Sequence, residues 1–255
     1  MSDLGVQPAA GTTPGLSQWQ RVVNTFTAPS KTFEDIKRGH KSWWMPFLIT
    51  VLCGAVLYGA IVKQVSWKTV YENQQRLAPE FAKRMMDQMP PEQRAKADLQ
   101  GPKNQAVTWA ISPLGLLLID VIAALVLWPT INFGFGGKAT FGSILAVEMF
   151  AGLALWPGRL LLGAIALFAG AAPEGFNVGN PAPTNLAAFL NQQETPAALY
   201  SLALSLDVLS IYCLVLTAIG IAIVAGVKRS SGYIAVFGWW GLIVLCSVGF
   251  AAAFS

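Results

Sequence analysis

Three long stretches of this sequence contain no charged side chain. Aspartate, glutamate, lysine and arginine are all absent from residues 42–62, 208–227 and 230–255. A helix needs about 20 apolar residues to cross the hydrocarbon core of a bilayer, and each stretch is that long. The strands of a transmembrane barrel would alternate apolar and polar residues, whereas these runs are apolar on every side. The sequence therefore predicts an integral membrane protein of the all-α class, a polytopic bundle of transmembrane helices.

The composition and the few reactive side chains argue against an enzyme. Only 12% of the residues are charged and 54% are apolar, whereas soluble domains carry about a quarter charged residues. Cys53, Cys213 and Cys246 all fall inside apolar runs, where thiols act as small packing groups, so we predict no disulfide. The single histidine, His40, argues against a zinc site or a serine-histidine hydrolase. We therefore predict a non-catalytic protein with no cofactor and no metal.

The apolar runs divide into about five membrane spans. We place them at residues 43–62, 106–129, 140–170, 199–227 and 233–254. As one straight helix, residues 140–170 would reach about 46 Å, well beyond a hydrocarbon core of about 30 Å. Pro157 removes a helix hydrogen bond and Gly158 relaxes the backbone, so we expect one kinked span there, with two half-spans as the alternative. The membrane domain as a whole is predicted to cover residues 42–255.

The segments outside the spans differ in character. Residues 1–15 are small and polar and predict a disordered tail. Residues 16–41 predict an amphipathic helical segment on the cytoplasmic side, with Ser17 and Gln20 spaced as a capping box. Residues 63–105 form a charged extramembrane loop in which we expect two short surface helices.

Basic residues in the short loops indicate the orientation. The loop at 171–198 contains no lysine or arginine, whereas the two loops assigned to the other side contain Lys138, Lys228 and Arg229. Basic loops tend to stay in the cytoplasm. We therefore expect a cytoplasmic N-terminus and a C-terminus on the opposite side, in the cytoplasmic (inner) membrane if the source is bacterial.

Two regions of the chain resemble a known family of membrane proteins. The stretch Pro29–Lys37, followed by Ser42–Phe47, resembles the entry to the Yip (Ypt/Rab-interacting protein) domain in its prokaryotic members. Near the other end, Leu206–Tyr212, Leu216–Gly220 and the basic turn Lys228–Arg229 are similar to the family's fourth span and the turn that follows it. The resemblance covers about residues 17–254. The charged loop at 63–105 and the proline-rich loop at 171–198 have no match in the family's pattern.

The resemblance implies a small membrane protein of about five spans without catalysis of its own. Eukaryotic relatives bind Rab-type GTPases or one another and take part in vesicle trafficking, but a Rab partner does not carry over to this chain. What the resemblance implies is a protein that recruits partners or organises membrane. The predicted partners are the lipid bilayer and other membrane or cytoplasmic proteins or a second copy of the chain. The basic residues lie beside the spans rather than in a stripe, so no nucleic acid is expected.

Four ionisable residues fall inside the predicted spans: Asp120, Glu148, Arg159 and Asp207. Such groups are costly in a bilayer and become functional candidates by default. We expect Arg159 to meet Asp120 or Asp207 from a neighbouring span. One interpretation is a structural ion pair or protonated carboxyl. The other is an ion or proton path through the carboxylates of a transporter or channel, which five spans without an internal repeat do not favour.

Two further groups of residues are candidates for contacts. The partner or lipid contact set is Trp19, Phe26, Phe33, Lys37, Arg38, Trp43 and Trp44. The N-terminal helix either docks a partner or rests on the lipid headgroups. The helix-packing set, spaced four residues apart, is Ala55 with Gly59, and Ala218 with Ala222 and Gly226. The spacing leaves open whether these faces pack within one chain or between copies.

Overall fold

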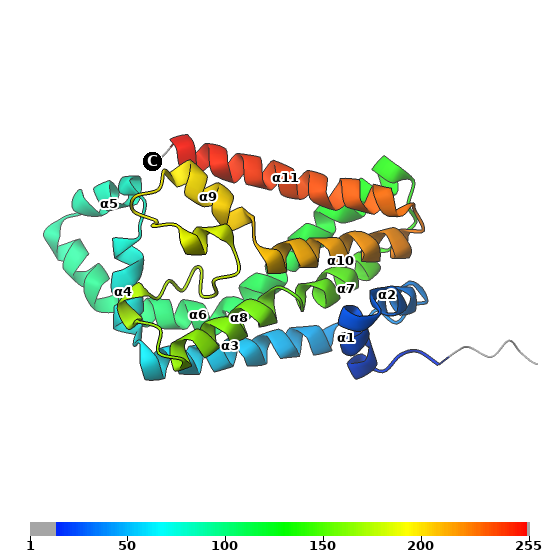
Figure 1. Cartoon of the computed structure of the whole chain (residues 1–255), viewed down its shortest axis with the longest axis horizontal. Helices are drawn as coiled ribbons and strands as arrows, with labels where there is room; N and C mark the ends of the chain where they lie inside the picture. The colour runs from blue at the N-terminus through cyan, green and yellow to red at the C-terminus, as the bar shows by residue number, and fades with distance from the viewer. Residues whose placement is uncertain (1–13, 254–255) are drawn as a thin grey trace, which may run out of the picture.

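The computed structural model describes residues 14–253, and the regular structure in this part of the chain consists of helices (Figure 1). The helices are α1 (Gln18–Thr27), α2 (Pro29–Lys37), α3 (Trp44–Gln64), α4 (Trp67–Arg76), α5 (Glu80–Asp87), α6 (Pro91–Pro129), α7 (Phe141–Gly152), α8 (Trp156–Phe168), α9 (Ala197–Ser205), α10 (Val208–Ala225) and α11 (Arg229–Ala253). Short turns of π or 3-10 helix occur at Thr130–Gly134, Pro173–Gly175 and Leu186–Phe189. The tail predicted for residues 1–15 falls almost entirely outside the described range.

Five helical segments in residues 14–253 are long and apolar enough to cross a membrane. They are Trp44–Gln64, Pro91–Gly134, Phe141–Phe168, Val208–Ala225 and Arg229–Ala253. This confirms the predicted class, an all-α polytopic bundle with five spans. The element α6 begins well before the predicted span at 106–129. Its 39 residues would reach about 58 Å, so its first turns extend beyond the hydrocarbon core.

The structure divides two of the predicted spans. The span predicted at 199–227 is wrong as one helix, because α9 ends at Ser205 and a new helix starts at Val208. Asp207 accounts for the break, since its side chain caps α10 by accepting a hydrogen bond from the N–H of Ser210 at 2.7 Å. In the third span the helix is interrupted at residues 153–155, because Pro157 has no N–H to donate to the carbonyl of Leu153 and its ring clashes with that carbonyl.

The core lies around α7 and α10, at the centre of the bundle. Fully buried side chains from these two helices include Ile144, Val147, Phe150, Leu216 and Ile221. Packed around this pair, α3 runs along α8, α6 packs on α7, and α11 packs on α10. The bundle therefore has a central two-helix layer with the remaining spans outside it.

The two ends of the bundle carry different short helices (Figure 1). Helices α1 and α2 lie at the end where α7 begins and α10 ends. Helices α4, α5 and α9, and the last turns of α11, lie at the opposite end. There, the side-chain amide of Asn73 donates to the carbonyls of Pro173 and Phe176, at 2.8 and 3.0 Å, and so ties α4 to the loop at 171–198.

Candidate functional site

Helices α1 and α2 form a hairpin whose turn is specified locally. Ser17 and Gln20 form the expected capping box at the start of α1, with hydrogen bonds of 3.2 and 2.9 Å. Ala28 ends this helix, and Pro29 occupies the first position of α2, where its missing N–H costs nothing. We call α1 and α2 together the N-terminal hairpin.

A buried carboxylate holds the N-terminal hairpin together. Asp35 is fully buried, and its carboxylate lies 3.5 Å from Arg21, 3.5 Å from Arg38 and 3.1 Å from Nδ1 of His40. The N–H of Leu16 also donates to it at 3.2 Å. Burial lowers the pKa of the Arg21 guanidinium below its usual value, and the negative charge of Asp35 acts in the opposite direction. The buried arginine and aspartate therefore compensate each other.

Arg21 also links the N-terminal hairpin to the rest of the chain. Its guanidinium donates to the carbonyls of His40 and Ser42, at 2.7 and 3.1 Å. The guanidinium carbon lies 5.7 Å from the ring centroid of Phe150 in α7, within cation-π range. One side chain therefore fixes α1 against both the linker to α3 and the central helix α7.

Apolar side chains of α2 enter the core of the bundle. Phe33 and Ile36 are both 0% exposed. A Cβ atom on Gly220 of α10 would lie 3.0 Å from the Phe33 ring and 2.5 Å from Cγ1 of Val147, so this close approach requires glycine. The assignment of Phe33 to the contact surface is therefore wrong. Its ring is a core group because α7 and α10 together form the site that receives it.

The outward face of α1 carries three large apolar side chains. Trp19, Val23 and Phe26 are 61%, 42% and 45% exposed, and their spacing places them on one side of the helix. Val23 was not among the predicted contact residues, although its position midway between the two aromatics indicates the same face. Of the remaining candidates, Lys37, Arg38 and Trp44 are exposed and Trp43 is half-buried, its ring 6.3 Å from that of Phe47.

Two of the four predicted intramembrane charges form a direct ion pair. The Arg159 guanidinium on α8 lies 3.1 Å from the carboxylate of Asp207, whose side chain is fully buried. Asp207 also accepts a hydrogen bond from Thr184, and Arg159 donates to the hydroxyl of Ser210 at 3.2 Å. Because Thr184 belongs to the loop before α9, the pair connects α8, this loop and the start of α10.

The other two charges lie on different helices from this pair. Asp120 lies on α6 and Glu148 lies on α7, two helices that pack on each other. One carboxylate oxygen of Glu148 is buried and has no hydrogen-bond partner in residues 14–253. Within that range no three metal-ligating side chains group together. Of the four predicted charges, the structure therefore pairs Arg159 with Asp207, whereas Asp120 and Glu148 form no ion pair within residues 14–253.

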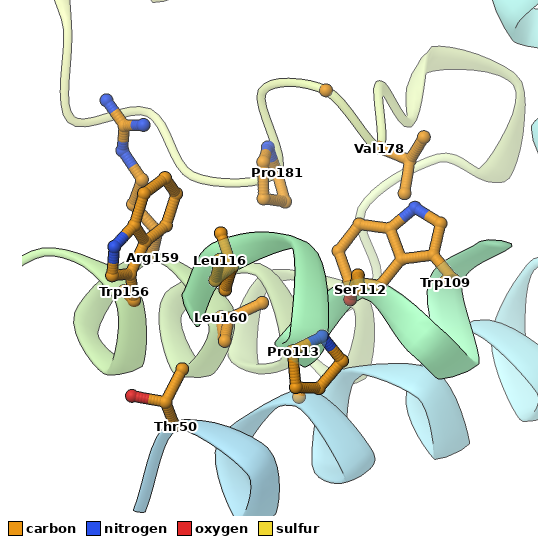
Figure 2. A pocket seen from close by; sticks show the side chains of 12 residues that line it. Thr50, Trp109, Ser112, Pro113, Leu116, Trp156, Arg159, Leu160, Val178 and Pro181 are labelled. Atoms are coloured by element: carbon orange, nitrogen blue, oxygen red, sulfur yellow. The ribbon is translucent and has the colours of Figure 1, made fainter. Parts of the chain in front are cut away.

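A cavity of about 180 Å³ adjoins Arg159 (Figure 2). It lies between α3, α6, α8 and the loop at 178–181, with Trp156 at the left and Trp109 at the right in this view. Pro113 and Leu160 lie between the two tryptophans. The lining is mostly apolar, and its one charged side chain, Arg159, is already paired with Asp207. The sequence contains no signal for this cavity, because its walls come from segments far apart in the chain.

The small residues predicted for helix packing fall into different environments. Ala218 and Ala222 face Gly232 of α11, where a Cβ atom would lie only 2.3 Å from the carbonyl oxygen of Ala218. Gly226 instead ends α10 with a left-handed backbone, φ +70°, which favours glycine. Ala55 and Gly59 are exposed, and nothing lies within 4 Å of a Cβ atom on Gly59. The close approach expected at Gly59 therefore does not occur within the described chain.

These features define a polytopic α-helical membrane protein with a short helical hairpin docked on its bundle. The family model of the Yip1 domain matches residues 23–251, nearly the whole chain. The chain therefore belongs to the Yip1 domain family, and the match begins within α1 and ends within α11. No curated protein and no solved structure matches the chain.

Proposed function

We propose that this protein is a non-catalytic membrane protein whose N-terminal hairpin recruits a partner protein on the cytoplasmic side. The observation that carries the proposal is the exposed stripe of Trp19, Val23 and Phe26 on a helix that is otherwise locked in place. Tryptophan and other large side chains supply most of the binding energy at protein interfaces. Membership of the Yip1 family supports a role of this kind.

The fixed position of the hairpin favours protein recruitment. The cluster around Asp35 and the buried ring of Phe33 hold the stripe in one orientation before any partner arrives. A preorganised surface avoids part of the entropy cost of binding. The rival role, in which the stripe only rests on lipid headgroups, requires no such fixation, because an interfacial helix binds by its apolar face alone.

We predict that Trp19→Ala combined with Phe26→Ala removes partner binding without unfolding the protein. Each side chain is substantially exposed, so its removal leaves no cavity in the core. Loss of two aromatic anchors weakens an interface by roughly 100-fold or more. The measurement is quantitative affinity purification of the full chain in mild detergent, with thermal unfolding checked in parallel.

The matched control is Met85→Ala combined with Leu99→Ala, which removes two exposed apolar side chains at the opposite end of the molecule. This control is expected to keep the partners of the unaltered protein. Recruitment through this stripe would be contradicted if the same proteins co-purified at unchanged yield with the hairpin variant. It would also be contradicted if the unaltered protein co-purified with lipid alone.

We also propose that the hairpin end of the bundle faces the cytoplasm. The proposal follows from the basic loops at this end and from the absence of lysine and arginine in the sequence of the loop at 171–198. The end of α11 lies at the other end of the bundle, which corresponds to opposite sides for the two termini.

The orientation predicts which introduced thiols an impermeant reagent reaches. With the native cysteines replaced by serine, a maleimide applied to intact cells should label Gln193→Cys and spare Lys31→Cys. Both positions are exposed, so accessibility within the protein does not bias the result. Labelling of Lys31→Cys but not of Gln193→Cys would show the opposite orientation and contradict the proposal.

A transport function has less support. The alternative requires Asp120, Glu148 and Asp207 to line one path, but Asp207 is paired with Arg159 and caps α10. No specific observation in the described residues favours the path, and we do not propose it.

A further inference from the structure

Five basic side chains gather where α2 ends, α7 begins and α10 ends. We call Lys37, Lys41, Lys138, Lys228 and Arg229 the basic patch. The Lys37 ammonium lies 3.8 Å from the position of a Cβ atom on Gly226, and the Lys41 ammonium donates to the hydroxyl of Thr140 at 2.8 Å. The N–H of Lys138 donates to the carbonyl of Ala225 at 3.0 Å. Three segments far apart in the sequence thus meet at one end of the bundle.

The positive charge of the basic patch is not compensated by carboxylates. Residues 36–43, 129–143 and 225–232 contain no aspartate or glutamate. None of the five side chains forms an ion pair with a carboxylate in residues 14–253. The nearest acidic residues in sequence are Glu34, which is exposed, and Asp35, which is buried and already shared by three cationic partners. The patch therefore presents its charge to an external anion.

Aromatic side chains place the basic patch at the surface of the bilayer. The Trp128 indole donates to the carbonyl of Ala139 at 2.9 Å, and the Trp239 indole donates to the hydroxyl of Thr130 at 3.0 Å. Phe133 and Trp44 are largely exposed at the same end. Such rings gather at the level of the lipid headgroups. The group that offers negative charge at this depth of a bilayer is the phosphate of a lipid.

We propose that the basic patch binds the headgroup of an anionic phospholipid and that this lipid bridges the N-terminal hairpin to the span bundle. Lys37 is the last residue of the hairpin and Lys41 lies in the linker that follows it, whereas Lys138 and Lys228 belong to loops between spans and Arg229 begins α11. A phosphate bound between them neutralises charges that otherwise repel one another across this junction. The inference is independent of the partner proposed above, since the aromatic stripe and the basic patch share no residue.

The test titrates the full chain in neutral detergent with phosphatidylglycerol and measures bound lipid by native mass spectrometry and thermal unfolding. Phosphatidylglycerol should bind at lipid concentrations below those at which the lipid itself aggregates, and it should raise the unfolding temperature. Phosphatidylcholine should do neither. The variant Lys41→Gln with Lys138→Gln and Lys228→Gln should bind phosphatidylglycerol roughly 10- to 100-fold more weakly. The variant Lys63→Gln with Lys96→Gln and Lys103→Gln makes the same charge change elsewhere and should bind it as the unaltered protein does.

Replacement of the same three lysines by arginine checks that charge rather than folding is responsible. This variant should retain phosphatidylglycerol binding, because arginine keeps the charge and binds phosphate at least as well. Equal binding of phosphatidylglycerol by both glutamine variants would overturn the proposal. Equal stabilisation by phosphatidylcholine would assign the effect to the acyl chains. Equal stabilisation by inorganic phosphate would assign the effect to a soluble anion. Either result would also overturn the proposal.

Discussion

Replacing Asp207 with alanine should lower the free energy of unfolding by about 3–5 kcal/mol, because it leaves Arg159 without its counter-charge. The aspartate side chain is fully buried. It accepts one hydrogen bond from the N–H of Ser210 in the first turn of α10 and another from the hydroxyl of Thr184. Its removal therefore breaks an ion pair, a helix cap and a loop contact at once. Reversible unfolding in mixed micelles measures the loss.

The matched control is Asp87→Ala, which also removes an aspartate from an ion pair. Asp87 lies 3.1 Å from Arg94, but its side chain is 69% exposed. Exposed pairs are worth about 0–1 kcal/mol because water screens the charges and the side chains lose entropy on pairing. If the two substitutions lowered stability equally, the Arg159–Asp207 pair would not be the junction between α8 and α10 that the structure indicates.

Replacing Phe33 with alanine should detach the N-terminal hairpin from the bundle. The ring is 0% exposed against α7 and α10, and removal of a buried phenylalanine costs about 3–5 kcal/mol. Phe26→Ala is the matched control on the same hairpin, because its ring is 45% exposed and its loss should cost less than about 1 kcal/mol. Trypsin cleavage after Lys31, Lys37 and Arg38 measures detachment in the folded protein.

The comparison between these two phenylalanines also separates two roles. Only the Phe33 variant should become sensitive to trypsin, whereas the Phe26 variant should keep the hairpin docked and lose partner binding only together with Trp19. Equal protease sensitivity of both variants would mean that Phe33 lies at the surface, as its place in an amphipathic sequence first suggested.

The sequence predicts the membrane class because the length of an uncharged run can be read locally and compared directly with the thickness of a bilayer. The family resemblance and the five spans follow from the same runs and from motifs within them. Breaks inside a run are harder to predict. Asp207 lies between two apolar stretches, and its cap on α10 together with its contacts to Thr184 and Arg159 makes a break at this point favourable.

The candidate site could be predicted only in part, since burial depends on residues far away in the chain. Phe26 and Phe33 both belong to the predicted amphipathic segment and contact set, and the difference between them arises because Gly220 leaves room for the ring of Phe33. Desolvation cost predicted that Arg159 would meet a carboxylate, but the choice of Asp207 over Asp120 requires the arrangement of α8 and α10. The same holds for the basic patch, whose members come from three separate segments.

In the proposed role, the N-terminal hairpin is a fixed part of the folded bundle and presents its outward face to a partner. Amide hydrogen exchange of residues 32–37 in the full chain, in neutral detergent or nanodiscs, tests it most directly. A helix of nine residues is not stable alone, so strong protection requires docking. We expect these amides to exchange at least about 100-fold more slowly than an unstructured chain, at rates near those of α7 and α10. Exchange as fast as that of the linker at 39–43 would show an undocked hairpin and contradict the account.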